Sequence, residues 1–177
     1  SACLVGSEMC KETGLSLAEL ARLVHPCGYY NAKALKLKSF ACWLGNHYND
    51  DLTRLFDSDS YHLRQQLLSI HGIGQETADS IILYAANKPI FVIDAYTRRI
   101  INRIGLAPNS NSYTAYQALF MHNLPTDAKL FNEYHALLVC LAKMFAELVP
   151  SASNAASITS AAMRLFSQGM KGVKIPL

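Results

Sequence analysis

The chain has 177 residues, of which 51% are hydrophobic and 16% are charged, a balance that indicates a folded globular protein and excludes a disordered tail. No apolar run reaches the roughly 18 to 20 residues of a membrane-spanning helix, so we expect no membrane partner and a cytoplasmic location, nucleoid-associated if the source is bacterial. A net charge of +3 is compatible with nucleic acid binding without indicating it, and five widely spaced cysteines predict neither a zinc site nor a disulfide framework.

Helical periodicity and helix punctuation recur along the whole chain. Ser16 and Glu19 form a predicted capping box for a first helix that stops at Pro26. Asn31 precedes a second amphipathic stretch, AKALKLKSFACWL. Further helices are predicted at about 50–56, 60–70, 75–87, 95–104, 112–122, 127–148 and 158–168. Because only the four residues 90–93 (IFVI) read as extended, and they have no partner run, the predicted class is all-α.

The stretch 67–85 (LLSIHGIGQETADSIILYA) predicts two helices joined by a tight glycine turn. Gly72 and Gly74 flank Ile73, which we expect to plug the core while neighbouring N–H groups face outward at a helix N-terminus, a favourable place for a phosphate. The expected inward positions of the second helix are Ala78, Ile81, Ile82 and Ala85. The residues expected to bind DNA phosphate are His71, Gly72, Ile73, Gly74, Gln75 and Thr77. For this pattern alone, the alternative is an ordinary turn between two helices that binds nothing.

Asp94 follows the extended run and precedes a predicted helix over 95–104, so by itself it reads as an N-cap. HGIGQETADSII, followed by FVIDAYTRRIINRIG, resembles the helix-hairpin-helix and catalytic-aspartate segment of the endonuclease III superfamily of DNA glycosylases, in order and spacing. The resemblance implies a helical barrel, double-stranded DNA with a damaged base as partner, and Asp94 as the catalytic carboxylate. That carboxylate would stabilise oxocarbenium-like charge and orient or deprotonate the attacking water.

Glu76 stands where bifunctional members of this superfamily carry a lysine nucleophile, eighteen residues before Asp94. Glutamate forms no Schiff base, so the resemblance implies a monofunctional glycosylase. GIGQETADSIILYA is similar in particular to the 3-methyladenine branch, which implies hydrolysis of the N-glycosidic bond of alkylated purines. An acidic complement to a helix N-terminus is an equally good interpretation of Glu76.

The resemblance covers about residues 16–150 and lacks the family's N-terminal helices, so we expect a barrel that is incomplete at the N-terminus. The expected division is a barrel domain at 1–108, containing the hairpin, and a C-terminal helical region at 109–177 that resembles an iron–sulfur cluster domain. Alanine stands where the cluster's cysteines would be, so we expect no cofactor or metal; the positions are Ala146, Ala152, Ala155 and Ala161. We also expect a monomer.

Two other functions remain open. The chain is either the glycosylase described above or a non-catalytic DNA-binding remnant that kept the hairpin, and Glu76 disfavours a bifunctional glycosylase and lyase. The base pocket is not assigned, because each candidate aromatic residue belongs more often to a core than to a base-binding pocket; the candidates are Tyr29, Tyr30, Trp43 and Tyr96.

Overall fold

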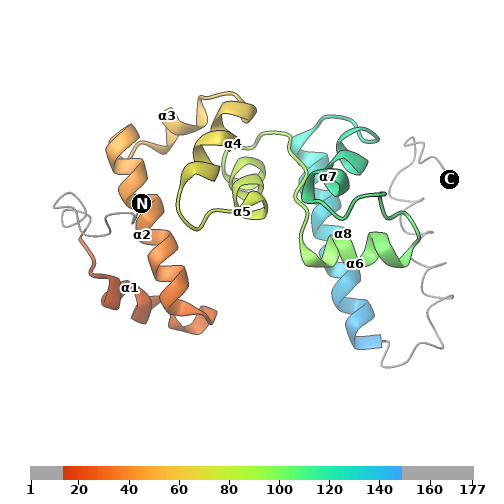
Figure 1. Cartoon of the computed structure of the whole chain (residues 1–177), viewed down its shortest axis with the longest axis horizontal. Coiled ribbons are helices and arrows are strands. Elements are labelled where there is room, and N and C mark those ends of the chain that lie inside the picture. The colour runs from red at the N-terminus through yellow and green to blue at the C-terminus, as the bar shows by residue number, and fades with distance from the viewer. Residues whose placement is uncertain (1–13, 149–177) are drawn as a thin grey trace. The chain divides into compact units, whose positions relative to one another are not determined.

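A computed structural model of the chain describes residues 14–148, with side chains described up to residue 143 (Figure 1). This described part is helical and contains no β-strand, in agreement with the all-α prediction. It divides into two compact units, one ending at Ala78 and the other beginning at Asp79. This boundary lies inside the predicted hairpin, whereas the predicted domain boundary lies between residues 108 and 109.

The first unit begins with the predicted capping box. The Ser16 hydroxyl accepts from the Glu19 amide at 3.2 Å, and the Glu19 carboxylate accepts from the Ser16 amide at 2.8 Å. The helices and the 3-10 turn of this unit are α1 (Leu17–Leu23), η2 (His25–Cys27), α2 (Tyr30–Tyr48), α3 (Leu52–Phe56) and α4 (Ser60–Ser69). Pro26 lies within η2, three residues after the end of α1, so the first helix stops slightly earlier than predicted. α1 packs against α2 (Figure 1).

Aspartate caps begin the two short helices that follow α2. The Asp51 carboxylate accepts from two amides in the first turn of α3, and Asp59 does the same for α4. These local bonds satisfy backbone donors that a helix N-terminus leaves without an intrahelical acceptor. The apolar core of the unit comes from every helix and includes Ala21, Ala34, Leu44, Leu55, Leu63, Leu67, Ile70 and Ile73.

The single helix predicted over 75–87 is interrupted. It consists of α5 (Gln75–Ser80) and a π-helical turn, η3 (Ile81–Ala85), in which the Ala86 amide donates to the Ile81 carbonyl five residues back. A π turn shifts the side-chain register relative to an α-helix. The prediction that Ala85 faces inward is therefore wrong, because Ala85 is exposed while Leu83 is buried.

The second unit also contains α6 (Ala95–Arg103), α7 (Tyr113–Met121) and α8 (Ala128–Leu148), with α6 packed against α8 (Figure 1). Its core is organised around Phe91 of the extended segment 90–93. The Phe91 ring stacks on Phe120 at a centroid distance of 3.9 Å and meets the rings of Phe131 and Tyr134 edge-on. The helix predicted at 158–168 lies outside the described residues.

A buried amide ties three segments of the second unit together. The Gln117 Nε2 group of α7 donates to Asp79 Oδ2 and to the Phe91 carbonyl, both at 2.7 Å. All three residues are buried, where such polar groups require partners. The bonds thus fix the start of the extended segment that leads to Asp94.

Among the helices in the described range, none combines the length and apolar character needed to cross a bilayer.

Candidate active site and hairpin

The turn between α4 and α5 requires glycine at Gly72, the first of its two glycines. Gly72 has φ +85°, and a Cβ atom added there would lie 2.5 Å from Lys36 Cγ, which is too close for any side chain to fit without movement. Ile73 is buried, as predicted, and its amide donates to the Ile70 carbonyl at 3.1 Å. The Ile73 amide is therefore already engaged inside the turn.

The surroundings of Gly74, unlike those of Gly72, would accommodate a side chain. Its φ is not in the left-handed region, and a Cβ atom there would meet nothing within 4 Å. The first α5 bond runs from the Ala78 amide to the Gly74 carbonyl, so helix geometry provides the Gln75 and Thr77 amides with no intrahelical acceptor. The backbone at Gly74 is thus open to close approach from solvent.

Most side chains around this turn face solvent. His71, Gln75, Glu76 and Thr77 are exposed, and Ile73 alone among the expected phosphate-binding residues is buried. Contact of these residues with phosphate remains a prediction, and so does the role assigned to Glu76.

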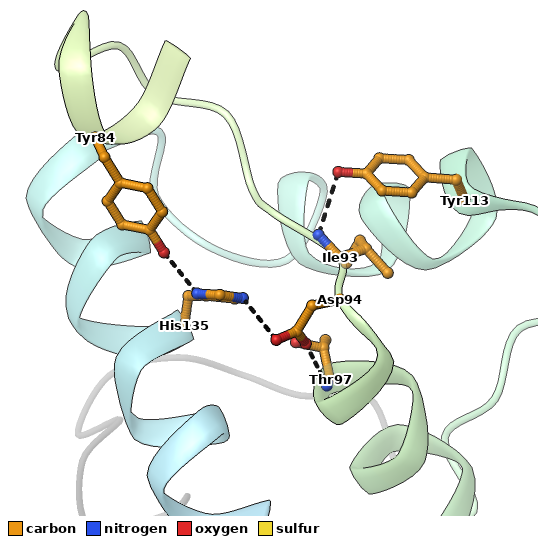
Figure 2. A network of polar contacts seen from close by, with 6 residues as sticks. All are labelled: Tyr84, Ile93, Asp94, Thr97, Tyr113 and His135. Atoms are coloured by element: carbon orange, nitrogen blue, oxygen red, sulfur yellow. Dashed lines mark hydrogen bonds and ion pairs between the residues drawn. The ribbon is translucent and has the colours of Figure 1, made fainter. Parts of the chain in front are cut away.

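Asp94 is the N-cap of α6, as its sequence context predicts. Its Oδ1 accepts from the Thr97 amide at 2.7 Å, while the hydroxyl of Tyr113 accepts from the Ile93 amide at 3.2 Å (Figure 2). The Asp94 side chain is only 14% exposed. Bonds on both sides of the Ile93–Asp94 peptide therefore limit how far the carboxylate can move.

His135 of α8 approaches the other carboxylate oxygen. His135 Nε2 lies 3.5 Å from Asp94 Oδ2, and the same imidazole meets the Tyr84 hydroxyl through Nδ1 at 2.6 Å (Figure 2). Nε2 is buried and makes no closer hydrogen bond to any described residue. η3, the N-terminus of α6, and α8 thus each contribute one side chain to a continuous row, Tyr84–His135–Asp94.

This arrangement keeps Asp94 ionised at neutral pH. Burial by itself would raise the pKa of the carboxyl, but the His135 side chain and the Thr97 amide outweigh burial and lower the pKa to about 2. Burial, followed by the nearby Asp94 charge, raises the pKa of Tyr84, which keeps its hydroxyl protonated and able to donate. The site therefore presents a fixed negative charge with little affinity for a proton.

Sequence reasoning identified Asp94 but not its partners. His135 occupies a single position in a long apolar helix, and Tyr84 lies in a helix whose π turn has no sequence signal. A carboxylate and an imidazole 41 residues apart meet only because α6 and α8 pack together.

Two arginines of α6 have structural partners. Arg98 donates to the carbonyl and side-chain oxygens of Asn111 and lies over the Tyr116 ring, and Arg99 lies over Tyr96. In the first unit, the Lys33 ammonium group donates to the carbonyl of Cys27, which lies just before α2.

Comparisons with known proteins identify the family of the chain. Residues 11–126, more than half of the chain, match the family described as HhH-GPD superfamily base excision DNA repair protein. The protein MJ1434 of Methanocaldococcus jannaschii, provisionally named a DNA repair glycosylase, is 42% identical over 128 residues, covering 72% of this chain and 58% of that protein. Endonuclease III of Sulfolobus acidocaldarius is 30% identical over 115 residues, covering 65% of this chain and 49% of the relative. The chain thus spans about half the length of the curated relatives it matches.

A solved structure has the same fold. The Helicobacter pylori 3-methyladenine DNA glycosylase MagIII, bound to 1,N6-ethenoadenine, aligns with a TM-score of 0.63 at 24% identity and covers 77% of this chain and 67% of its own. The fold and the match over residues 11–126 lead to one conclusion: the chain belongs to the HhH-GPD superfamily of base excision DNA repair proteins.

Proposed function

We propose that this protein is a DNA glycosylase that hydrolyses the N-glycosidic bond of damaged bases, with Asp94 as the catalytic carboxylate. Membership of the base excision repair superfamily supports the reaction class. The observation that carries the proposal is the buried and ionised Asp94, held through both carboxylate oxygens at the N-terminus of α6.

The electrostatics of Asp94 favour one of its two expected roles. As the C1′–N bond breaks, positive charge develops on the deoxyribose, and a fixed carboxylate stabilises that charge. A general base works best with a pKa near the operating pH, and a pKa of about 2 is far below it. Asp94 therefore acts mainly as an electrostatic stabiliser and as an acceptor that orients the attacking water, whose oxygen adds to C1′ while its proton passes to solvent.

Alkylated purines are the proposed substrate class, and hydrolysis without strand cleavage is the proposed outcome. Methylation at N3 of adenine makes the base cationic in DNA, so it departs as a neutral molecule without general acid catalysis. Glu76 supports monofunctional chemistry because a carboxylate forms no Schiff base with the sugar. The name of the MagIII structure, a 3-methyladenine DNA glycosylase, is consistent with this substrate class.

The remaining elements of the proposal concern partners. Double-stranded DNA would be held through backbone phosphate at the turn that contains Gly72 and Gly74, where exposed backbone allows close approach. We propose further that the protein works as a monomer in the cytoplasm. We also propose that it binds no iron–sulfur cluster, because alanine, which stands at the expected cysteine positions, has no ligand atom. The alanine positions concerned lie outside the side chains that the structure describes.

Release of free base from methylated duplex DNA tests the reaction, with the wild-type chain and Asp94→Asn compared side by side. Asn remains a good N-cap, so the substitution removes charge while preserving the start of α6. The matched control is Asp127→Asn, because Asp127 likewise accepts from an amide three residues on, at the start of α8. We expect Asp94→Asn to lower the single-turnover rate by roughly 100- to 1,000-fold and Asp127→Asn to leave it nearly unchanged.

Absence of base release by the wild type, together with salt-sensitive binding to duplex DNA, would instead identify a non-catalytic DNA-binding remnant. Borohydride reduction on abasic DNA tests the lyase alternative. We expect no covalent adduct, and an adduct abolished by replacing a lysine would contradict the monofunctional assignment.

A further inference from the structure

The Asp94 carboxylate makes one contact within its own helix, α6, and one with a helix distant in sequence, α8. The Thr97 amide, which donates to Oδ1, belongs to the same helix end, so this hydrogen bond forms whenever α6 forms. His135, which faces Oδ2, lies on α8, and Tyr84, which faces His135, lies on η3. The orientation of Oδ2 is therefore set by tertiary packing, whereas that of Oδ1 is set locally.

His135 lies between Tyr84 and Asp94, with one ring nitrogen facing each. The Tyr84 hydroxyl lies 2.6 Å from Nδ1, and a phenol can either donate to a bare Nδ1 or accept from Nδ1–H. The ionised Asp94 carboxylate opposite Nε2 can only accept, so a neutral imidazole carries its proton on Nε2, and Tyr84 then donates to Nδ1. In a protonated imidazole both nitrogens carry a proton. In either state Nε2–H points at Asp94 Oδ2, whereas the opposite neutral tautomer would present a bare nitrogen to the carboxylate.

The contact between His135 and Asp94 is largely shielded from solvent. The side chains of His135 and Asp94 are 11% and 14% exposed, and Nε2 has no better partner among the described residues. Burying a polar nitrogen without a partner costs free energy, and Oδ2 is the nearest group that offsets this cost for Nε2. The placement of His135 opposite Oδ2 therefore needs a reason beyond helix packing. Tyr84, by contrast, is 46% exposed, so burial of its ring contributes little to the fold.

We propose that His135 and Tyr84 are positioning residues for the glycosylase reaction: Tyr84 fixes the imidazole with Nε2–H toward Asp94, and His135 fixes Oδ2 of the catalytic carboxylate. This inference rests on the proposed function of Asp94. Neither residue is required to touch the DNA. Their role is to hold the negative charge at one place, so that no reorganisation is needed when positive charge develops on the sugar.

The described titratable groups that face this carboxylate are limited to the same row. His135 faces it from α8 and Tyr84 lies behind His135 on η3, while the Tyr113 hydroxyl of α7 is bonded to the neighbouring Ile93 amide. Loss of His135 would leave Asp94 with the Thr97 amide and with burial, which raises the pKa of a carboxyl.

Single-turnover base release and duplex affinity, measured on the full chain, separate positioning from folding. We expect His135→Ala to lower the rate about 10- to 100-fold and Tyr84→Phe to lower it about 3- to 10-fold, with duplex Kd changed by less than about twofold. His135→Gln, which retains an N–H donor, should recover part of the rate. The matched control is Tyr116→Phe, which removes a tyrosine hydroxyl bonded to Asn102 in the same unit and should leave the rate within about twofold.

Coupling to Asp94 provides the sharper test. In an Asp94→Asn background, His135→Ala should cause little further loss, because the charge that His135 positions is gone. An equal loss in both backgrounds, or an equal loss in Tyr84→Phe and Tyr116→Phe, would show a general structural role and would overturn the inference.

Imidazole ¹⁵N NMR provides a readout that needs no activity. With the His135 signals identified by their loss in His135→Gln, we expect a proton on Nε2 in the wild type and a shift in the tautomer equilibrium in Tyr84→Phe. A neutral ring with its proton on Nδ1 alone would overturn the inference. Failure of the wild type to release base, with the expected NMR result, would contradict the proposed function and leave the Tyr84–His135–Asp94 arrangement established.

Discussion

The two compact units hold their candidate functional groups by different means. In residues 14–78, the tight turn depends on local features: the positive φ of Gly72, the buried Ile73 and serine or aspartate caps on the helices. In residues 79–143, Asp94 is held by side chains from η3 and α8 as well as by its own helix. Large apolar side chains that remain exposed are also concentrated in the first unit, as Leu23 and Tyr29 illustrate.

The functions proposed for the turn and for Asp94 account for this difference. A turn that offers backbone to phosphate needs the correct conformation and open space, which neighbouring residues supply. A carboxylate that stabilises charge in a reaction must be both ionised and fixed, which requires hydrogen bonds from distant segments to outweigh burial. Substitutions in the second unit should therefore act over longer range than those in the first.

The largest expected effect is on the aromatic core of the second unit. Phe91→Ala removes a fully buried ring that contacts three other aromatic residues, and we expect a loss of about 3 to 5 kcal/mol in the free energy of unfolding. Chemical denaturation measures the loss, and hydrogen exchange with mass spectrometry locates it. Equal loss of protection in residues 14–78 and 79–143 would show that the two units unfold as one.

Gly72→Ala should break the turn of the first unit. The new Cβ would lie 2.5 Å from Lys36 Cγ and would place alanine at φ +85°, so we expect a destabilisation of roughly 1 to 3 kcal/mol and weaker duplex binding. Gly74→Ala is the matched control for stability, because nothing lies within 4 Å of its Cβ position. If Gly74→Ala weakens duplex binding without destabilising the protein, DNA approaches the backbone at that position; equal destabilisation by both substitutions would contradict the geometric distinction.

Acid should expose the charge network of the second unit. The pKa of Asp94 is lowered from 3.8 to about 2, so its ionised form stabilises the folded state above pH ~4, and this contribution disappears as the pH falls through about 2. The contribution is at most about 2.5 kcal/mol. The difference in unfolding free energy between wild type and Asp94→Asn should be constant near neutrality and should shrink between pH 4 and pH 2, measured by urea denaturation; a difference that grows on acidification would contradict the lowered pKa.

The smallest expected effect is local to a helix end. Ser16→Ala removes the capping box of α1 and Ser112→Ala removes the serine cap of α7, so each should cost about 1 kcal/mol. Hydrogen exchange should place the loss within the first turn of the affected helix in each case. A loss that spreads through either unit would show that cap strength, and not tertiary packing, limits its stability.

The sequence alone predicted those features that depend on neighbouring residues. The helical class, the Ser16–Glu19 capping box, the glycine turn with Ile73 buried, and Asp94 as an N-cap all follow from backbone donors, turn geometry and apolar spacing within one or two turns of helix. The family resemblance carried by HGIGQETADSII and VIDAYTRR was confirmed by the match over residues 11–126.

Only the tertiary structure decided what surrounds the carboxylate. The π turn at η3 exposes Ala85 and leaves the Tyr84 hydroxyl against His135, and α8 packing against α6 places that histidine 3.5 Å from Asp94. No periodicity encodes these contacts, because each depends on how helices distant in sequence dock. The sequence determined which residue carries the charge, and packing determined its partners and its pKa, since desolvation and long-range hydrogen bonds exist only in the folded protein.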